Sequence, residues 1–220
     1  MEAIISFFQR GGFFMYAILV MGIFALTIII ERMIVLLGKN RIDTAGFVNQ
    51  VIGYIRDGKP DRALEFCNYS RAALPEIVRA GLEQANRTPD EIQNAMEVKA
   101  MSVIPKLEKR TGYLSMTANV ATLLGLLGTV WGLIQSFQAV AHADAAQKAA
   151  LLSSGISVAM NTTAFGLITA IPCMIAYAFL HEKTNELIDE INENVARIYQ
   201  YLVHRSKTVE STHESPKNTW

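Results

Sequence analysis

Hydrophobic and polar positions divide the chain into three long apolar stretches separated by mixed regions. The second and third stretches, MTANVATLLGLLGTVWGLIQSFQAVA and LLSSGISVAMNTTAFGLITAIPCMIAYAFL, contain no Asp, Glu, Lys, Arg or His. Each is longer than the about 20 residues that an α-helix needs to cross a bilayer. The first stretch begins at Phe13 and runs to Leu37, although Glu31 and Arg32 interrupt it near its end. The pattern predicts an all-α membrane protein with three transmembrane helices.

Helical spacing also occurs outside these stretches and predicts long cytoplasmic helical extensions. Thr88-Pro89-Asp90-Glu91 combines a cap, a proline and two acids, which is typical of a helix start. No strong stop follows, so we expect Pro105 to kink this helix and the helix to continue into the second span. Apolar residues recur every three or four positions from Leu187 to Leu202. That stripe needs a partner, either the helix at 90–112 or a neighbouring subunit.

Basic residues indicate the orientation of the spans. They concentrate between the first and second stretches and after the third, whereas the opposite side carries only Arg10 and Lys148. The positive-inside rule therefore predicts an outside N-terminus and a cytoplasmic C-terminus. In chain order we expect an interfacial segment (1–12), transmembrane helix 1 (13–37), a cytoplasmic helical region (38–112), transmembrane helix 2 (113–141), a periplasmic turn (142–148), transmembrane helix 3 (149–180), a cytoplasmic amphipathic helix (181–204) and a disordered tail (205–220).

Composition excludes several other classes. Twenty basic and 20 acidic residues balance, which gives no reason to expect nucleic acid as a partner. Cys67 and Cys173 form neither a CxxC motif nor a Cys/His cluster, so no metal site is predicted. The sequence shows no Ser/His/Asp set or phosphate-binding loop. We therefore expect no cofactor and no enzymatic activity.

Small and hydroxyl residues recur at helical spacing in the second and third stretches. In the second stretch they form one narrow stripe, which consists of Thr122, Gly125, Thr129, Gly132 and Ser136. In the third stretch the main polar patch is Asn161-Thr162-Thr163. One interpretation is that these residues pack helices together. The other is that the polar ones line a lumen and offer hydroxyls to an ion or a buried side chain, with Gly125 and Gly132 as a smooth, closely packed lumen face.

Neither stretch supplies a group that can carry a proton through the membrane. A proton relay normally includes a carboxylate or histidine within the span. This chain is therefore not a complete proton pathway by itself, and if it conducts protons, a partner must supply the acid. Hydroxyls such as those of Thr129 and Thr163 could then tune the pKa of that acid by hydrogen bonding.

Two motifs resemble those of a known family. LLGLLGTVWGLIQSF resembles the second-span signature of the MotA/TolQ/ExbB proton-channel family. GISVAMNTTAFGLITAIPCMIAY is similar to its third-span signature, including the Thr-Ala-x-Gly-Leu core and Ala-Ile-Pro. Three spans resemble the ExbB and TolQ branches better than the four-span MotA branch. Val158 stands where ExbB and TolQ usually have Glu, so a second protonatable site is not expected here. The Asn161-Thr162-Thr163 run looks more like relatives that drive gliding motility.

The resemblance implies a function, an assembly and a location. It implies a homopentameric ring around a dimer of a single-span ExbD- or TolR-like partner that carries a membrane aspartate. The ring would lie in the bacterial inner membrane and convert proton motive force into mechanical work on the cell envelope. By motif position, Thr129 and Thr163 match the family's pore threonines near that aspartate. A structural scaffold without ion conduction is the alternative. The sequence leaves open which machine is driven: TonB-type uptake, Tol-type constriction or gliding. It also leaves open sodium in place of protons, although the lack of carboxylate ligands favours protons.

Overall fold

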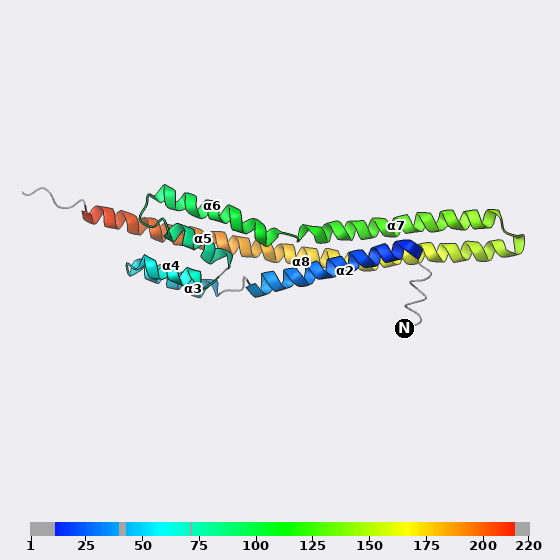
Figure 1. Cartoon of the computed structure of the whole chain (residues 1–220), viewed down its shortest axis with the longest axis horizontal. Coiled ribbons are helices and arrows are strands. Elements are labelled where there is room, and N and C mark those ends of the chain that lie inside the picture. The colour runs from blue at the N-terminus through cyan, green and yellow to red at the C-terminus, as the bar shows by residue number, and fades with distance from the viewer. Residues whose placement is uncertain (1–11, 40–42, 71, 214–220) are drawn as a thin grey trace, which may run out of the picture. The chain divides into compact units, whose positions relative to one another are not determined.

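The computed structural model describes residues 12–39, 43–70 and 72–213, and every regular element in this part of the chain is a helix. The predicted interfacial segment at 1–12 therefore lies almost entirely outside the described residues. The elements are α2 (Gly12–Ile34), the π-helix η1 (Val35–Lys39), α3 (Thr44–Arg56), α4 (Pro60–Asn68), α5 (Ala73–Leu82), α6 (Pro89–Glu108), α7 (Gly112–Ala141) and α8 (Ala145–His213) (Figure 1). They form two compact units.

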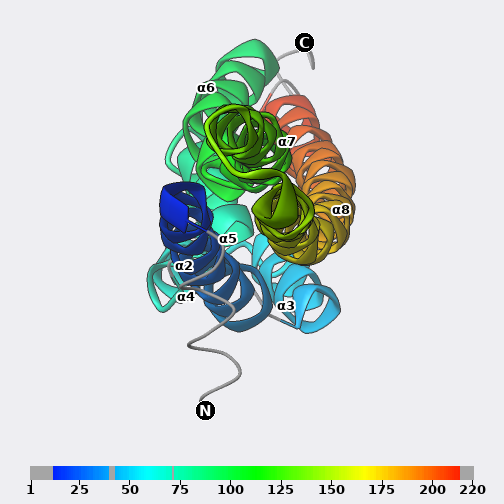
Figure 2. The same cartoon turned by 90° about the vertical axis from the view of Figure 1, so that its right-hand side faces the viewer.

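The first unit, whose described residues are 12–32 and 110–181, holds the three apolar helices. The helices α2, α7 and α8 are each long and apolar enough to cross a membrane, which confirms the predicted architecture. Within the unit they lie side by side (Figure 2). Gly22 of α2 packs against Thr169 of α8, and the ring of Phe14 meets that of Trp131 of α7 at 6.4 Å between centroids.

Leucine, isoleucine and aromatic side chains cover the outside of the first unit. Phe24, Leu123 and Ile175 are each about half or more exposed, at 49%, 62% and 65%. Small residues occupy the closest contacts between α7 and α8. This arrangement is typical of lipid-facing helices, because lipid tails solvate apolar side chains and leave close backbone packing to hold the helices together.

The second unit, whose described residues are 33–39, 43–70, 72–109 and 182–213, has a water-soluble pattern. Helices α3 to α6 and the end of α8 enclose one apolar core. Ile191, Ile198 and Leu202 of α8 belong to this core, together with side chains such as Val51 and Ile77. The apolar stripe from Leu187 to Leu202 therefore has its partner within the same chain.

A break separates α6 from α7, contrary to the expectation of one continuous helix. Pro105 lies inside α6, which ends three residues later at Glu108. Arg110 then adopts a φ of 70°, a left-handed conformation that interrupts helical hydrogen bonding. The sequence signal for this break is weak, because a non-glycine residue rarely adopts positive φ.

The structure also differs from the expected boundaries around α8. The turn between α7 and α8 covers only residues 142–144, since α8 begins at Ala145. At the other end, α8 continues to His213, so residues 205–213 are helical where we expected disorder. No glycine or proline interrupts the chain after Pro172 until Pro216, and nothing in the backbone therefore ends the helix earlier. Residues 214–220 lie outside the described part.

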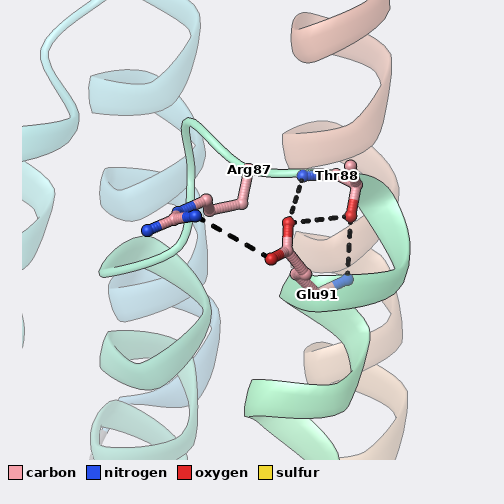
Figure 3. A network of polar contacts seen from close by, with 3 residues as sticks. All are labelled: Arg87, Thr88 and Glu91. Atoms are coloured by element: carbon pink, nitrogen blue, oxygen red, sulfur yellow. Dashed lines mark hydrogen bonds and ion pairs between the residues drawn. The ribbon is translucent and has the colours of Figure 1, made fainter.

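The start of α6 confirms the predicted cap at Thr88, and its hydrogen bonds form a capping box (Figure 3). The backbone N–H of Glu91 donates to the Thr88 hydroxyl at 3.4 Å. The Glu91 carboxylate accepts from the Thr88 backbone N–H at 3.0 Å and from the Thr88 hydroxyl at 2.9 Å. Arg87 lies 4.0 Å from the same carboxylate. The backbone and hydroxyl hydrogen bonds from Thr88, and then the charge of Arg87, lower the pKa of Glu91.

The lowered pKa of Glu91 predicts a specific loss of stability in acid. Because the folded chain binds this proton more weakly than the unfolded chain, the carboxylate stabilises α6 above the unfolded pKa. That stabilisation disappears as the pH falls through the lower, folded pKa. Glu91→Gln keeps a side-chain acceptor at the same helix position but does not titrate. We expect hydrogen exchange at the start of α6 to accelerate in acid more for the wild type than for this variant, compared at equal pH. Parallel pH profiles would contradict this assignment.

Candidate functional site

Two threonine side chains on the facing helices α7 and α8 lie within hydrogen-bonding distance of each other. Thr163 of α8 donates to the backbone carbonyl oxygen of Gly125 of α7 at 3.0 Å. The Thr163 oxygen also lies 3.4 Å from Thr129 Oγ1, and Thr129 bonds back to the carbonyls of its own helix. Both side chains are half-buried. We refer to Thr129 and Thr163 as the hydroxyl pair.

Helix geometry explains why these two residues meet. Thr129 follows Gly125 by four positions, so both lie on one face of α7. A Cβ on Gly125 would approach Thr163 Cα at 3.3 Å, because the absence of a side chain lets the two backbones come close. The short threonine side chain of α8 can then reach a carbonyl oxygen of α7. The pair thus depends on the glycine beneath it.

Four of the six predicted lumen-lining residues have accessible surface in the chain. Thr122 is exposed, and Thr129, Asn161 and Thr163 are half-buried. The Thr122 hydroxyl bonds the carbonyl of Ala118 in its own helix at 3.0 Å. These four residues are available to face something outside the chain.

The other two predicted lining residues, Ser136 and Thr162, are buried, at 4% and 1% exposure. Ser136 donates to the carbonyl of Gly132 at 3.0 Å, and Thr162 donates to that of Val158 at 2.9 Å. A side chain with no surface of its own cannot line a space outside the chain. The expectation that Ser136 and Thr162 line a lumen is therefore wrong for this conformation, and both residues pack helices together.

Gly125 and Gly132 are also buried, so the predicted lumen face of glycines needs the same correction. A Cβ at Gly132 would lie 3.2 Å from the Cβ of Ala159 on α8. A Cβ at Gly125 would meet only backbone atoms of α8, at 3.3–3.4 Å. These glycines allow α7 and α8 to approach closely, and they are not on a surface past which another helix slides.

Sequence reasoning missed three further glycines that complete this contact, which we call the glycine seam: Gly125, Gly128, Gly132, Gly155 and Gly166. A Cβ at Gly166 would lie 2.8 Å from the carbonyl oxygen of Ala121. One at Gly155 would overlap the Ser136 hydroxyl, and one at Gly128 would overlap the Thr162 side chain. The signal in the sequence was the spacing of small residues at three or four positions on both helices, which favours close packing in membranes.

Charged groups occur in the first unit only near the ends of its helices. Between Gly112 and Ala141, and between Ala149 and Leu180, the sequence has no Asp, Glu, Lys, Arg or His. The described residues also contain no group of three or more His, Cys, Asp or Glu that could hold a metal ion. The chemistry that the hydroxyl pair offers is hydrogen bonding to a carboxyl group or to water, without a titratable group of its own.

Glu31 and Arg32 were interpreted as interfacial anchors that could also pair with other helices. Glu31 does pair with another helix region, because its Oε1 accepts a hydrogen bond from Arg110 NH1 just before α7. Arg32 NH2 lies 3.8 Å from the same oxygen, and the Arg32 side chain is only 4% exposed. These contacts join the end of α2 to the start of α7.

Comparison with known proteins adds a family match. A family model described as the MotA/TolQ/ExbB proton channel family matches residues 70–193. This range includes all of α7, the apolar part of α8, the glycine seam and the hydroxyl pair.

Individual relatives are consistent with this match. A putative biopolymer transport protein ExbB homolog of Methanothermobacter thermautotrophicus is 29% identical over 86% of this chain and 66% of that protein. The Tol-Pal system protein TolQ of Haemophilus influenzae is 33% identical over 72% of this chain and 68% of TolQ. The chain thus matches about two thirds of the length of each. In fold it is similar to a chain of Campylobacter jejuni MotAB, with a TM-score of 0.63 at 16% identity, over 96% of this chain and 88% of the other.

Proposed function

The chain belongs to the MotA/TolQ/ExbB proton channel family, and on that premise we propose that it is the ring-forming subunit of a proton-driven motor in the bacterial inner membrane. Five copies surround a dimer of a single-span, ExbD- or TolR-like partner. Proton flow along the contact between ring and partner drives mechanical work on the cell envelope. Protons moving across 100 mV release about 2.3 kcal/mol each, so a few transfers per cycle are enough to shift a packed helix interface.

The observation that carries this proposal is the hydroxyl pair in an otherwise apolar, uncharged hairpin. Thr163 and Thr129 lie within 3.4 Å of each other and are partly accessible from outside the chain. Thr122 and Asn161 supply further accessible polar groups on the same two helices. A protonated carboxyl group on a partner helix can donate a hydrogen bond to the oxygen of Thr129 or Thr163. When ionised, the same group can accept one from either hydroxyl after that hydroxyl turns away from its present carbonyl acceptor. The pair would thus stabilise an acid that must gain and lose a proton inside a membrane.

The names of the relatives support the proposed partner, and the distribution of basic residues supports the proposed orientation. TolQ is described as part of the Tol-Pal system, and the structural neighbour is a MotAB complex. Basic residues are concentrated between α2 and α7 and in the part of α8 that follows its apolar stretch. By the positive-inside rule they favour a cytoplasmic location for these two segments and a periplasmic N-terminus. Val158 occupies the position of the family glutamate, so the proposed pathway depends on the partner's acid alone.

Thr163→Val tests this proposal because it removes the hydroxyl and keeps the shape of the side chain. We expect the variant to assemble with the co-expressed partner at the wild-type stoichiometry, measured by native mass spectrometry. Proton flux in liposomes that contain the complex should fall about 10-fold or more, which corresponds to the net value of one hydrogen bond at the charge-transfer step.

Thr27→Val is the matched control. The Thr27 hydroxyl also lies in an apolar helix, but it bonds the carbonyl of Ile23 within α2 at 2.9 Å and is exposed. Its loss should leave proton flux unchanged. Equal proton flux in the wild type and Thr163→Val would contradict the role of the hydroxyl pair. Absence of proton flux in the wild-type complex would favour a structural scaffold without ion conduction. A wild-type complex that carries sodium flux in the absence of a proton gradient would contradict the choice of proton.

A further inference from the structure

An excess of positive charge lies where α2 ends and α7 begins. Arg110 and Arg32 both approach one carboxylate oxygen, Glu31 Oε1. The three side chains together carry one net positive charge. All three belong to the first unit, at the ends of helices that are long and apolar enough to cross a membrane.

The Arg110 side chain has more N–H donors than it uses in hydrogen bonds to the described residues. A guanidinium group carries five N–H donors, and among the described residues Arg110 uses its side chain for one hydrogen bond, to Glu31. The Arg110 side chain is 46% exposed, so its remaining donors are accessible. The left-handed backbone at Arg110, with φ of 70°, places this residue in the break between α6 and α7 and outside either helix.

The N-terminus of α7 is also incompletely satisfied. This 30-residue helix has Thr111 at its N-cap, and no side chain caps its first turn. The backbone N–H groups of Tyr113 and Leu114 donate to the carbonyl oxygens of Arg110 and Thr111, each at 3.1 Å. The Thr111 side-chain oxygen is buried, in a residue 3% exposed, and has no hydrogen-bond partner among the described residues. The N-terminus of a long helix attracts anions through its free N–H groups and its dipole. An unpartnered buried hydroxyl costs free energy unless a ligand or water satisfies it.

We propose that Arg110, Thr111 and the first turn of α7 bind the phosphate group of an anionic phospholipid, with Arg32 adding positive charge behind them. The phosphate accepts hydrogen bonds from the Arg110 guanidinium and lies at the positive end of the α7 dipole. A water held beneath the phosphate satisfies the buried Thr111 hydroxyl. This site is separate from the proposed ion pathway and does not depend on it.

The surroundings favour a lipid over free phosphate. Ile30 of α2 is 53% exposed, and Tyr113 and Met116 of α7 are 54% and 61% exposed. These apolar side chains flank the charged cluster in sequence on both helices and offer a surface for acyl chains. Basic pockets at the ends of transmembrane helices bind lipid headgroups in this way.

The test is native mass spectrometry of the full-length protein released from nanodiscs that contain phosphatidylcholine and phosphatidylglycerol. The wild type should retain phosphatidylglycerol selectively. Arg110→Gln removes the charge, and Arg110→Gly removes it while favouring the left-handed backbone, so that the break is kept. Each should reduce phosphatidylglycerol retention about fivefold, the effect of one basic residue near an anionic headgroup.

Arg87→Gln is the matched control, because Arg87 is 65% exposed and lies 4.0 Å from Glu91 in the second unit. It loses the same charge and should retain lipid as the wild type does. Equal retention of the two lipids by the wild type would overturn the proposal, as would wild-type retention by both Arg110 variants. Displacement of phosphatidylglycerol from the wild type by inorganic phosphate would also overturn it, because the site would then belong to the free anion.

Discussion

Replacing Gly166 with leucine should abolish the packing of α7 against α8. A Cβ at this position would lie 2.8 Å from the Ala121 carbonyl oxygen and 3.1 Å from Gly125 Cα. Both are backbone atoms, so no rotamer change can relieve the overlap, and the helices must separate. Overpacking by even one or two carbons costs about 1–3 kcal/mol, and leucine adds four. We expect the detergent-solubilised variant to lose helical circular dichroism at much lower denaturant concentration than the wild type.

Gly112→Ala provides the comparison within the same unit. Gly112 begins α7, and a Cβ there would meet nothing within 4 Å. Because alanine restricts the unfolded chain more than glycine does, this variant should be as stable as the wild type or up to about 1 kcal/mol more stable. A Gly166→Leu protein as stable as Gly112→Ala would refute the glycine seam. It would restore the interpretation in which small residues of the hairpin face an open lumen.

Replacing Ile198 with alanine should strongly destabilise the core around the C-terminal part of α8. Ile198 is fully buried in the core that α8 shares with α3 to α6. Truncation of a buried isoleucine to alanine costs about 2–5 kcal/mol, because it removes apolar contacts and leaves a cavity. We expect hydrogen exchange to accelerate throughout the core helices of the second unit, including α5 and α6.

Tyr201→Ala tests whether the effect is specific to the buried face. Tyr201 lies three residues further along α8 and is 45% exposed. Its truncation should change exchange only locally. If Ile198→Ala left exchange in α5 and α6 unchanged, the apolar stripe of α8 would have its partner in a neighbouring subunit and not in its own chain.

The sequence alone was sufficient to predict properties that depend on residues close together in the chain. The three spans follow from the length and apolarity of each stretch, since a bilayer core imposes a minimum helix length. The helix start at Thr88 also follows from a cap, a proline and two acids in a row, and the structure shows a capping box there. The spacing of small residues in the hairpin also indicated close helix packing, which was one of the two interpretations given for them.

The candidate site could be predicted only in part, because its halves lie far apart in the sequence. Thr129 and Thr163 are 34 positions apart, and their contact depends on how α7 and α8 are rotated about their axes. Helical spacing alone puts Thr122, Gly125, Thr129, Gly132 and Ser136 on nearly one face. It does not say which part of that face meets α8, so Gly125, Gly132 and Ser136 were misplaced together.

By itself, the sequence determined that this is an all-helical membrane chain with an uncharged, hydroxyl-containing hairpin, because length, apolarity and residue spacing are local properties. Only the tertiary structure decided which small residues pack and which remain accessible, since this depends on the rotation of one helix against another. It also placed the break at Arg110 and joined that residue to Glu31, 79 positions away. Positive φ at a non-glycine residue and ion pairs between distant helices have no local pattern from which to predict them.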